Sequence, residues 1–250
     1  MEPASPRRVS RYTIQFMKRI ADRQFLSLFD DRRESRFEDL QFERCVFTNC
    51  VLAQSIDPAQ RSQVRNVQLT NCQAVGCSIG PALLENVVVD GLATADLLIV
   101  WGALFRHVTL KGRIGSLKLN AYPDIDERNK GLALPFDQAR AKFYDATDWA
   151  LDISGAICGS FDATGIPARL FRRDPVTQAV VRRSNIEKGN WRRKVPAWNR
   201  HWVDVLDVIF DDEAPEDTVL VAPKAARKAK VQTLIEGLDN LRQLGVADPD

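Results

Sequence analysis

Over a long central stretch of this chain, a residue of apolar type recurs at every fifth position. The positions are Val64, Leu69, Ala74, Ile79, Leu84, Val89, Thr94, Ile99, Leu104, Thr109, Ile114 and Leu119. Only Thr94 and Thr109 in this set are not apolar. A helix needs apolar residues three and four apart, and a half-buried strand needs alternation. A sustained spacing of five therefore predicts a short repeating unit of another kind.

Each position of this series is taken as the centre of one five-residue unit. The residue two places before each centre is mostly small or apolar, as at Val67, Cys72 and Ala82. The same rhythm begins at Phe37, Phe42, Phe47 and Leu52, and it returns at Leu151, Ala156, Phe161, Ile166 and Phe171. Interruptions are predicted near 53–62 and 120–148. If each pentad forms one short face and a corner, four pentads close a square coil, and coils stack about 4.8 Å apart.

This pattern resembles the pentapeptide-repeat family. The chain is identified as a degenerate member, because Cys, Val and Leu are frequent where that family prefers Ala two places before the centre. The resemblance implies a mainly β fold, a right-handed quadrilateral β-helix with a large apolar residue at the centre of each face. It also brings in the role known for some members, which bind topoisomerases in place of DNA.

Both ends of the chain depart from the five-residue rhythm. Residues 1–34 are predicted to be a lead and a capping helix over residues 11–29, because Ile14, Met17, Ala21, Phe25 and Leu28 fall three and four apart behind Ser10. Residues 35–172 form the repeat region. Residues 173–250 are predicted to hold a basic segment and a helical cap, with a strand near 178–181, a helix containing Trp198, Trp202 and Leu206, and a last helix over 224–244 that Gly245 ends.

Composition limits the functional classes. The 250 residues carry a formal net charge of +2, which argues against a chain that as a whole imitates DNA or attracts it. No run of 18 apolar residues and no signal peptide is present, so we expect a cytoplasmic protein with no membrane contact.

The residues that carry chemistry are few. Cys45, Cys50, Cys72 and Cys77 have a spacing that suggests zinc, but all four fall at the small position before a centre, which favours packing in the core. The two histidines, His107 and His201, are not placed together by any motif. No catalytic triad, carboxylate pair or phosphate loop is recognised, so we expect no catalytic, cofactor-binding or metal-binding residue and no enzyme activity.

Two charged surfaces are candidates for binding. The basic set, which would suit a nucleic acid with an indole as a stacking surface, is Arg172, Arg173, Arg182, Arg183, Trp191, Arg192 and Arg193. The acidic set, which would suit a basic protein partner, is Asp204, Asp207, Asp211, Asp212, Glu213, Glu216 and Asp217. Each set has a plainer interpretation as a solvated face, and the two sets are close enough in sequence to pair with each other.

The leading hypothesis is a non-enzymatic protein-binding scaffold, such as a bacterial immunity or antitoxin factor that blocks a partner protein. Its basis is the absence of a catalytic motif together with the acidic set. The alternatives are a DNA mimic that contacts topoisomerases and a nucleic-acid binder that uses residues 169–194. A protein partner is expected first and a nucleic acid second, and the chain is expected to be a monomer or a homodimer.

Overall fold

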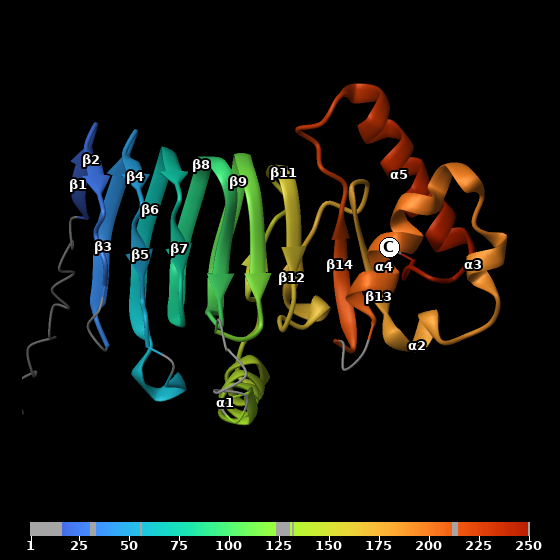
Figure 1. Cartoon of the computed structure of the whole chain (residues 1–250), viewed down its shortest axis with the longest axis horizontal. Helices are drawn as coiled ribbons and strands as arrows, with labels where there is room; N and C mark the ends of the chain where they lie inside the picture. The colour runs from blue at the N-terminus through green and yellow to red at the C-terminus, as the bar shows by residue number, and fades with distance from the viewer. Residues whose placement is uncertain are drawn as a thin grey trace, which may run out of the picture.

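The computed structural model describes residues 17–30, 34–55, 57–123, 131, 133–211 and 215–249. Over these residues the protein is mainly β, and twelve strands form one large sheet with parallel pairing. Figure 1 shows these strands side by side along the long axis, with the C-terminal helices at one end. No described helix is long and apolar enough to cross a membrane.

The elements have the following bounds. The large sheet contains β1 (Lys18–Ala21), β2 (Gln24–Leu26), β3 (Arg36–Glu43), β4 (Val46–Thr48), β5 (Val51–Leu52), β6 (Ser62–Val75), β7 (Ser78–Ile79), β8 (Ala82–Trp101), β9 (Leu104–Asn120), β10 (Leu151–Asp152), β11 (Ala156–Ala163) and β12 (Phe171–Arg172). The small antiparallel sheet contains β13 (Gln178–Arg182) and β14 (Asp217–Val221). The helices are α1 (Ala133–Asp145), α2 (Arg183–Ile186), α3 (Trp191–Lys194), α4 (Arg200–Ile209) and α5 (Lys228–Gln243), and the 3₁₀ helices are η1 (Pro58–Gln60), η3 (Ala168–Leu170) and η4 (Ala197–Asn199).

Equivalent residues of successive strands lie next to one another in the sheet. Val67 pairs with Val87 about twenty residues later, and Val87 pairs with Val108 after a similar interval. All three side chains are buried. Parallel pairing in register therefore places each apolar position of one strand on the same position of the next, and this column forms part of the core.

A left-handed backbone residue bends the long strands every five residues. In β6 these residues are Asn66 and Asn71, with φ of 52° and 51°, and in β8 they are Asn86 and Gly91, with φ of 55° and 78°. Glycine has no Cβ to clash in this region, and asparagine tolerates it better than most residues. The corner follows two residues after each apolar centre, and it is the local cause of the five-residue period.

The predicted phase is correct up to Thr94 and then shifts by one residue. Ala74 pairs with Thr94, twenty residues later, whereas Ile79 pairs with Val100, twenty-one residues later. One additional residue in β8 displaces the positions that follow, so Ile99, Leu104 and Thr109 are not the centres, and a further register shift in the pairing of β8 with β9 brings the predicted centre Leu119 beside Val100. The residues that pair with the centres Leu84 and Val89 are Phe105 and Leu110.

The phase predicted for the last block is also wrong. Leu151 pairs with Val108, so it occupies the position two residues before the centre. Ile153, which is fully buried, takes the centre that the sequence pattern assigned to Leu151. The centre of a pentad and the residue two places before it both point inward, because side chains alternate along a strand. Apolar character alone therefore does not reveal a shift of the whole pattern by two residues.

The helix predicted over residues 11–29 is wrong for the described residues 17–29, which form β1 and β2. Residues 11–16 lie outside the described chain. Ile20 pairs with Phe42 and Phe25 pairs with Phe47, and the rings of Phe25 and Phe47 stack 5.0 Å apart. The helical spacing is real, but Ile20 and Phe25 also continue the five-residue spacing. The strand form satisfies the backbone of β3 and β4, which a helix would leave unpaired.

The C-terminal end of the large sheet is met by the β13 and β14 pair. Val180, Val219 and Val221 face the core of the large sheet, whereas Ala179, Val181 and Leu220 face a second core built with the helices. The predicted strand near 178–181, the helix containing Trp202 and the last helix are present, and Gly245 follows α5 with φ of 69°. Strand β14 was not predicted, and Trp198 lies before α4 with half of its surface exposed.

The interruption between β9 and β10 carries α1, which packs on the sheet through Phe136 and Tyr144. The Tyr144 hydroxyl accepts a hydrogen bond from the Phe105 amide, at 3.3 Å. The Arg61 guanidinium lies over the Phe136 ring and donates to the carbonyls of Pro58 and Gly102. Burial lowers the pKa of Arg61 to about 10. This arginine therefore joins both interruptions of the repeat to one corner of the sheet.

Replacing Val108 with lysine tests the inward column. Val108 is 2 % exposed, so Val108→Lys should lower the free energy of unfolding by about 4 kcal/mol or more, because it buries an unpaired charge. Thr109→Lys is the matched control, since Thr109 is half-buried and lies beside Asp152, and it should change stability by less than about 1 kcal/mol. Urea unfolding followed by circular dichroism measures both, and equal losses would contradict the observed phase.

Gly80→Ala tests how closely neighbouring strands approach at a corner. A Cβ at Gly80 would lie 1.7 Å from the carbonyl oxygen of Ala53, so the backbone must move, and we expect a loss of about 1 to 3 kcal/mol or more. Gly131→Ala meets nothing within 4 Å and should stay within about 0.5 kcal/mol of the parent. Thermal unfolding compares the two variants, and an unaffected Gly80→Ala would show that the corner has room to relax.

Candidate functional site

An open groove of about 600 Å³ lies between β11 of the large sheet and the C-terminal elements α4 and β14. Its apolar lining includes Phe161 from β11, Val205, Val208 and Ile209 from α4, and Pro223 beyond β14. These residues are far apart in the sequence, and no local motif links them. Sequence reasoning therefore missed the groove, although it placed Phe161 in the repeat and Val205 on a helix.

Helix α4 is held so that one apolar face is buried and a second faces the groove. Trp202, Val203 and Leu206 are buried in the second core, and the Trp202 indole donates to the carbonyl of Leu234 at 2.9 Å. Val208 lies on the other face and is 80 % exposed. An apolar side chain so exposed on an ordered helix is a candidate contact for another molecule.

Charged groups surround this apolar lining. Asp162 pairs with Lys118 at 3.6 Å, while His201, Asp204 and Lys230 line the α4 and α5 side. Burial lowers the pKa of His201, and Lys230 lowers it further while Asp204 opposes the change. His201 is therefore mainly neutral at pH 7, and the groove is an apolar surface with both signs of charge at its edge.

The residues of the predicted acidic set lie in several different places in the structure. Asp204 lies at the groove, and Asp207 forms an ion pair with Arg192 at 2.8 Å. Asp211 and Glu216 are exposed, and Asp212 and Glu213 lie outside the described residues. Asp217 begins β14, where its carboxylate accepts from the Ala168 amide at 2.9 Å and burial raises its pKa. Among the members of this set that the structure describes, only Asp204 contributes to the groove.

The predicted basic set does not form one open surface. Trp191 is 4 % exposed and donates its indole N–H to the Ile186 carbonyl, so its ring is not available to stack on a base. Arg182 pairs with Asp248 at 2.8 Å, and Arg192 pairs with Asp207. Arg183 lies over the Phe210 ring, Arg173 donates to the Gln178 carbonyl, and Arg193 is exposed. Arg172 lies elsewhere, 4.0 Å from the Trp149 ring.

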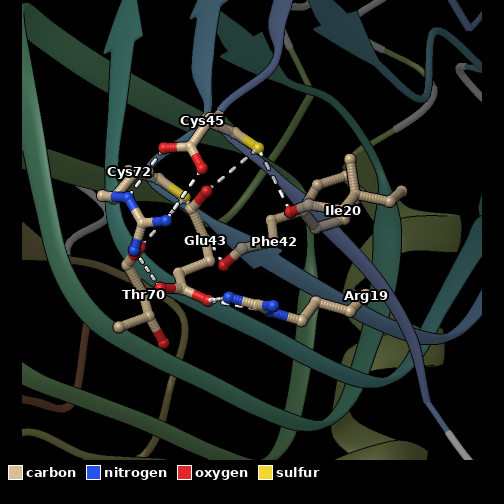
Figure 2. Close-up of polar contacts among 9 residues, drawn as sticks. Arg19, Ile20, Phe42, Glu43, Cys45, Thr70 and Cys72 are labelled. Atoms are coloured by element: carbon tan, nitrogen blue, oxygen red, sulfur yellow. Dashed lines mark hydrogen bonds and ion pairs between the residues drawn. The ribbon is translucent and has the colours of Figure 1, made fainter.

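The four early cysteines lie in registered pairs and bond to the backbone. Cys45 donates to the carbonyl of Ile20 at 3.4 Å, and Cys72 donates to that of Phe42 at 3.7 Å. Cys50 and Cys77 repeat this arrangement one face later. Figure 2 shows Cys45 and Cys72 together above the contact between Arg19 and Glu43. Among the described residues, no group of three or more His, Cys, Asp or Glu side chains is arranged to hold a metal ion.

Sequence reasoning also missed a row of polar side chains that crosses the large sheet. Asn66 donates to Asp39 at 3.0 Å, Asn86 donates to Asn66 at 3.3 Å, and the two ring nitrogens of His107 contact Asn86 and Asp148. The side chains thus form one row across β3, β6, β8 and β9. The hydrogen bond from His107 is the main cause that lowers the pKa of Asp148.

Comparison of this chain with models of known protein families, with curated proteins and with solved structures gives no match.

The thiols provide a test of the buried repeat positions. Burial raises the pKa of Cys72 and raises that of Cys158 to about 11, so little thiolate is present at pH 8. We expect Ellman's reagent to modify Cys45, Cys72 and Cys158 at least about a hundredfold more slowly in the native protein than in urea. Mass spectrometry of the labelled peptides measures each site. Rapid native labelling of Cys45 would contradict its inward position.

Proposed function

We propose that this protein is a non-catalytic protein-binding scaffold, and that its bent, registered strands are coils of a right-handed quadrilateral β-helix. Two observations support the coil assignment: the parallel pairing of residues about twenty positions apart, and the left-handed corners at every fifth residue. A repeat of this kind buries its inward side chains and leaves rigid outer faces and ends for recognition. Such surfaces lose little conformational entropy on binding.

The groove beside β11 is the observation that carries the proposal. Val208 is 80 % exposed, and it is surrounded by Val205, Ile209 and Phe161 on a surface built from two different cores. A partner segment with an apolar anchor would cover these side chains. Asp204, which makes no hydrogen bond or ion pair with the described residues, favours a basic side chain next to that anchor.

Binding is favoured over catalysis by the relation among the polar groups of the groove. His201, Asp204 and Lys230 line the same surface, but no hydrogen bond or ion pair joins them within the described chain. The usual signature of an activated nucleophile is a base within hydrogen-bond reach, and these three side chains do not supply that pair. An immunity or antitoxin factor that blocks a partner protein is the specific form of this hypothesis.

The two alternatives have less support from the surface. A DNA mimic needs a strongly negative face, but Glu38, Arg65, Glu85 and Arg106 alternate in sign along neighbouring strands. A nucleic-acid interface over residues 169–194 would lack the indole of Trp191 and would compete with the acidic partners of Arg182 and Arg192.

Site-specific photocrosslinking in the native cell tests the groove. A photoreactive phenylalanine derivative in place of Val208 should capture one defined protein, because this side chain would lie in the interface. The same replacement of Val176, a valine that is 60 % exposed in the turn before β13, is the matched control and should not capture it. With the captured protein in hand, Val208→Asp should weaken its affinity at least about tenfold, while Val176→Asp leaves it unchanged.

The proposal fails if both positions capture the same set of proteins, or if the affinity is equal for Val208→Asp and Val176→Asp. Neither substitution should alter the unfolding temperature by more than a few degrees, since both side chains lie at the surface. That measurement separates a lost contact from a lost fold.

A further inference from the structure

Strand β11 has an open edge at the groove. Among the described residues it pairs with β9 alone, while β12, the next strand along the chain, pairs with β10 instead. After β12 the chain continues to β13, which belongs to the small sheet, so no described strand covers the second side of β11. In Figure 1, β11 and β12 are the last strands of the large sheet before β14. An edge of this kind is a template for pairing with another chain.

The hydrogen bond that follows β11 shows which main-chain groups face the open side. The Thr164 amide donates to the Leu119 carbonyl of β9 at 2.9 Å. Successive residues of a parallel strand direct their N–H and C=O groups alternately to one neighbouring strand and to the other. Asp162, two residues before Thr164, therefore also faces β9. Phe161 and Ala163 direct their main-chain groups to the open side.

The open side of β11 forms one wall of the groove. Residues 159–162 line the groove in an unbroken run. Just before this run, the Cys158 carbonyl accepts a hydrogen bond from the Ala225 amide at 3.2 Å. Beyond that contact, the outward N–H and C=O of Phe161 have no hydrogen-bond partner in the described chain. A segment that lies in the groove in an extended conformation would supply both partners.

The charge on this wall favours a basic side chain in such a segment. On the outer surface of the sheet, charges alternate across neighbouring strands, as where Arg65 pairs with both Glu38 and Glu85. Asp162 pairs with Lys118 of β9 at 3.6 Å, and it also lines the groove. Cross-strand pairs of opposite charge are stabilising. A cation is therefore favoured at the next position beside Asp162.

Helix α4 limits the partner segment further. Asp204 lines the groove and makes no hydrogen bond or ion pair with the described residues, so it adds to the preference for a cation. Val205 and Val208 of the same helix give the groove apolar contacts, and Lys230 of α5 supplies a positive charge. This lining favours one basic residue next to apolar residues over a strongly basic segment.

We propose that an extended segment of the binding partner adds to the open edge of β11 as the next strand, with an apolar side chain on Phe161 and a basic side chain beside Asp162. This inference rests on the proposed function, because it states how the partner occupies the same groove. Strand β9 already meets β11 in this way from the other side, with Leu117 beside Phe161 and Lys118 beside Asp162. A copy of β9 therefore has the chemistry that the open side requires.

A fluorescein-labelled peptide with the sequence of residues 113–120, added to the full-length protein, tests this pairing by fluorescence anisotropy. We expect binding below millimolar concentration. In the register of β9, the N–H of the lysine that copies Lys118 would donate to the Phe161 carbonyl. Methylation of that peptide nitrogen should weaken binding at least about tenfold, because it removes the donor and blocks the approach of the strand.

Methylation of the next peptide nitrogen, in the leucine that copies Leu119, is the matched control. This N–H would face away from β11, so the affinity should stay within about twofold of the parent peptide. Equal effects of the two methyl groups, or no binding at millimolar peptide, would overturn the proposal. The reverse pattern would show that the peptide replaces β9 instead of adding to β11, and it would overturn the proposal as well.

A reversal of charge tests the position beside Asp162. Asp162→Lys should weaken the parent peptide at least about fivefold, and a peptide with glutamate in place of its lysine should bind this variant more tightly than the parent peptide does. Asp90→Lys is the matched control, since Asp90 also pairs with a lysine on β9, Lys111 at 3.2 Å, but does not line the groove. Equal losses for Asp162→Lys and Asp90→Lys would contradict the assigned position.

Amide exchange measured by NMR separates strand addition from other ways of filling the groove. Saturating peptide should slow exchange of the Phe161 amide at least about tenfold, whereas the Asp162 amide, which already faces β9, should not change. If Val208→Asp weakens the peptide but Phe161 stays unprotected, the groove binds without strand addition, and this inference fails while the scaffold proposal stands. If Phe161 is protected but crosslinking at Val208 captures no protein in the cell, the scaffold proposal fails and the open edge stands.

Discussion

The structure depends on backbone pairing between parallel strands that stay in register from one strand to the next. Once Val67, Val87 and Val108 are aligned, the positions around them on the same strands are aligned as well, and both apolar positions of these pentads enter the same core. The corners make this possible, because a left-handed residue every fifth position redirects the strand without ending its pairing. Hydrogen bonding and burial therefore impose the same period, and neither would maintain it alone.

The sequence pattern predicted this framework well but predicted its phase only in part. The five-residue spacing identified the inward positions from Phe37 to Thr94, since Phe42, Leu69 and Val89 do lie on one another. It failed from Ile99 to Thr109, because a single additional residue in β8 leaves the local spacing of apolar residues almost unchanged. Only the partner strand reveals such a shift, and the partner is not encoded locally.

Other misses share this cause. Residues 17–29 have helical and five-residue spacings together, and the presence of β3 and β4 as pairing partners decides in favour of strands. Trp191 stands in a basic stretch that suggests an exposed indole, but the Ile186 carbonyl and the second core bury it. The groove joins Phe161 with Val208, which belong to different cores. Long-range contacts decided each case, whereas α4, α5 and β13, which depend on local patterns, were predicted.

The surface features follow from the contrast between a periodic sheet and its irregular attachments. Within the sheet, side chains of equal position stack, so charges alternate and amides form rows, as in the series from Asp39 to His107. Such rows continue as long as the strands repeat, and they end where an irregular segment meets the sheet. At His107 the row meets Asp148 from the segment after α1, and between β11 and α4 a groove remains in which Val208 is exposed. The proposed binding groove is a consequence of a repeat that stops at a surface it does not match.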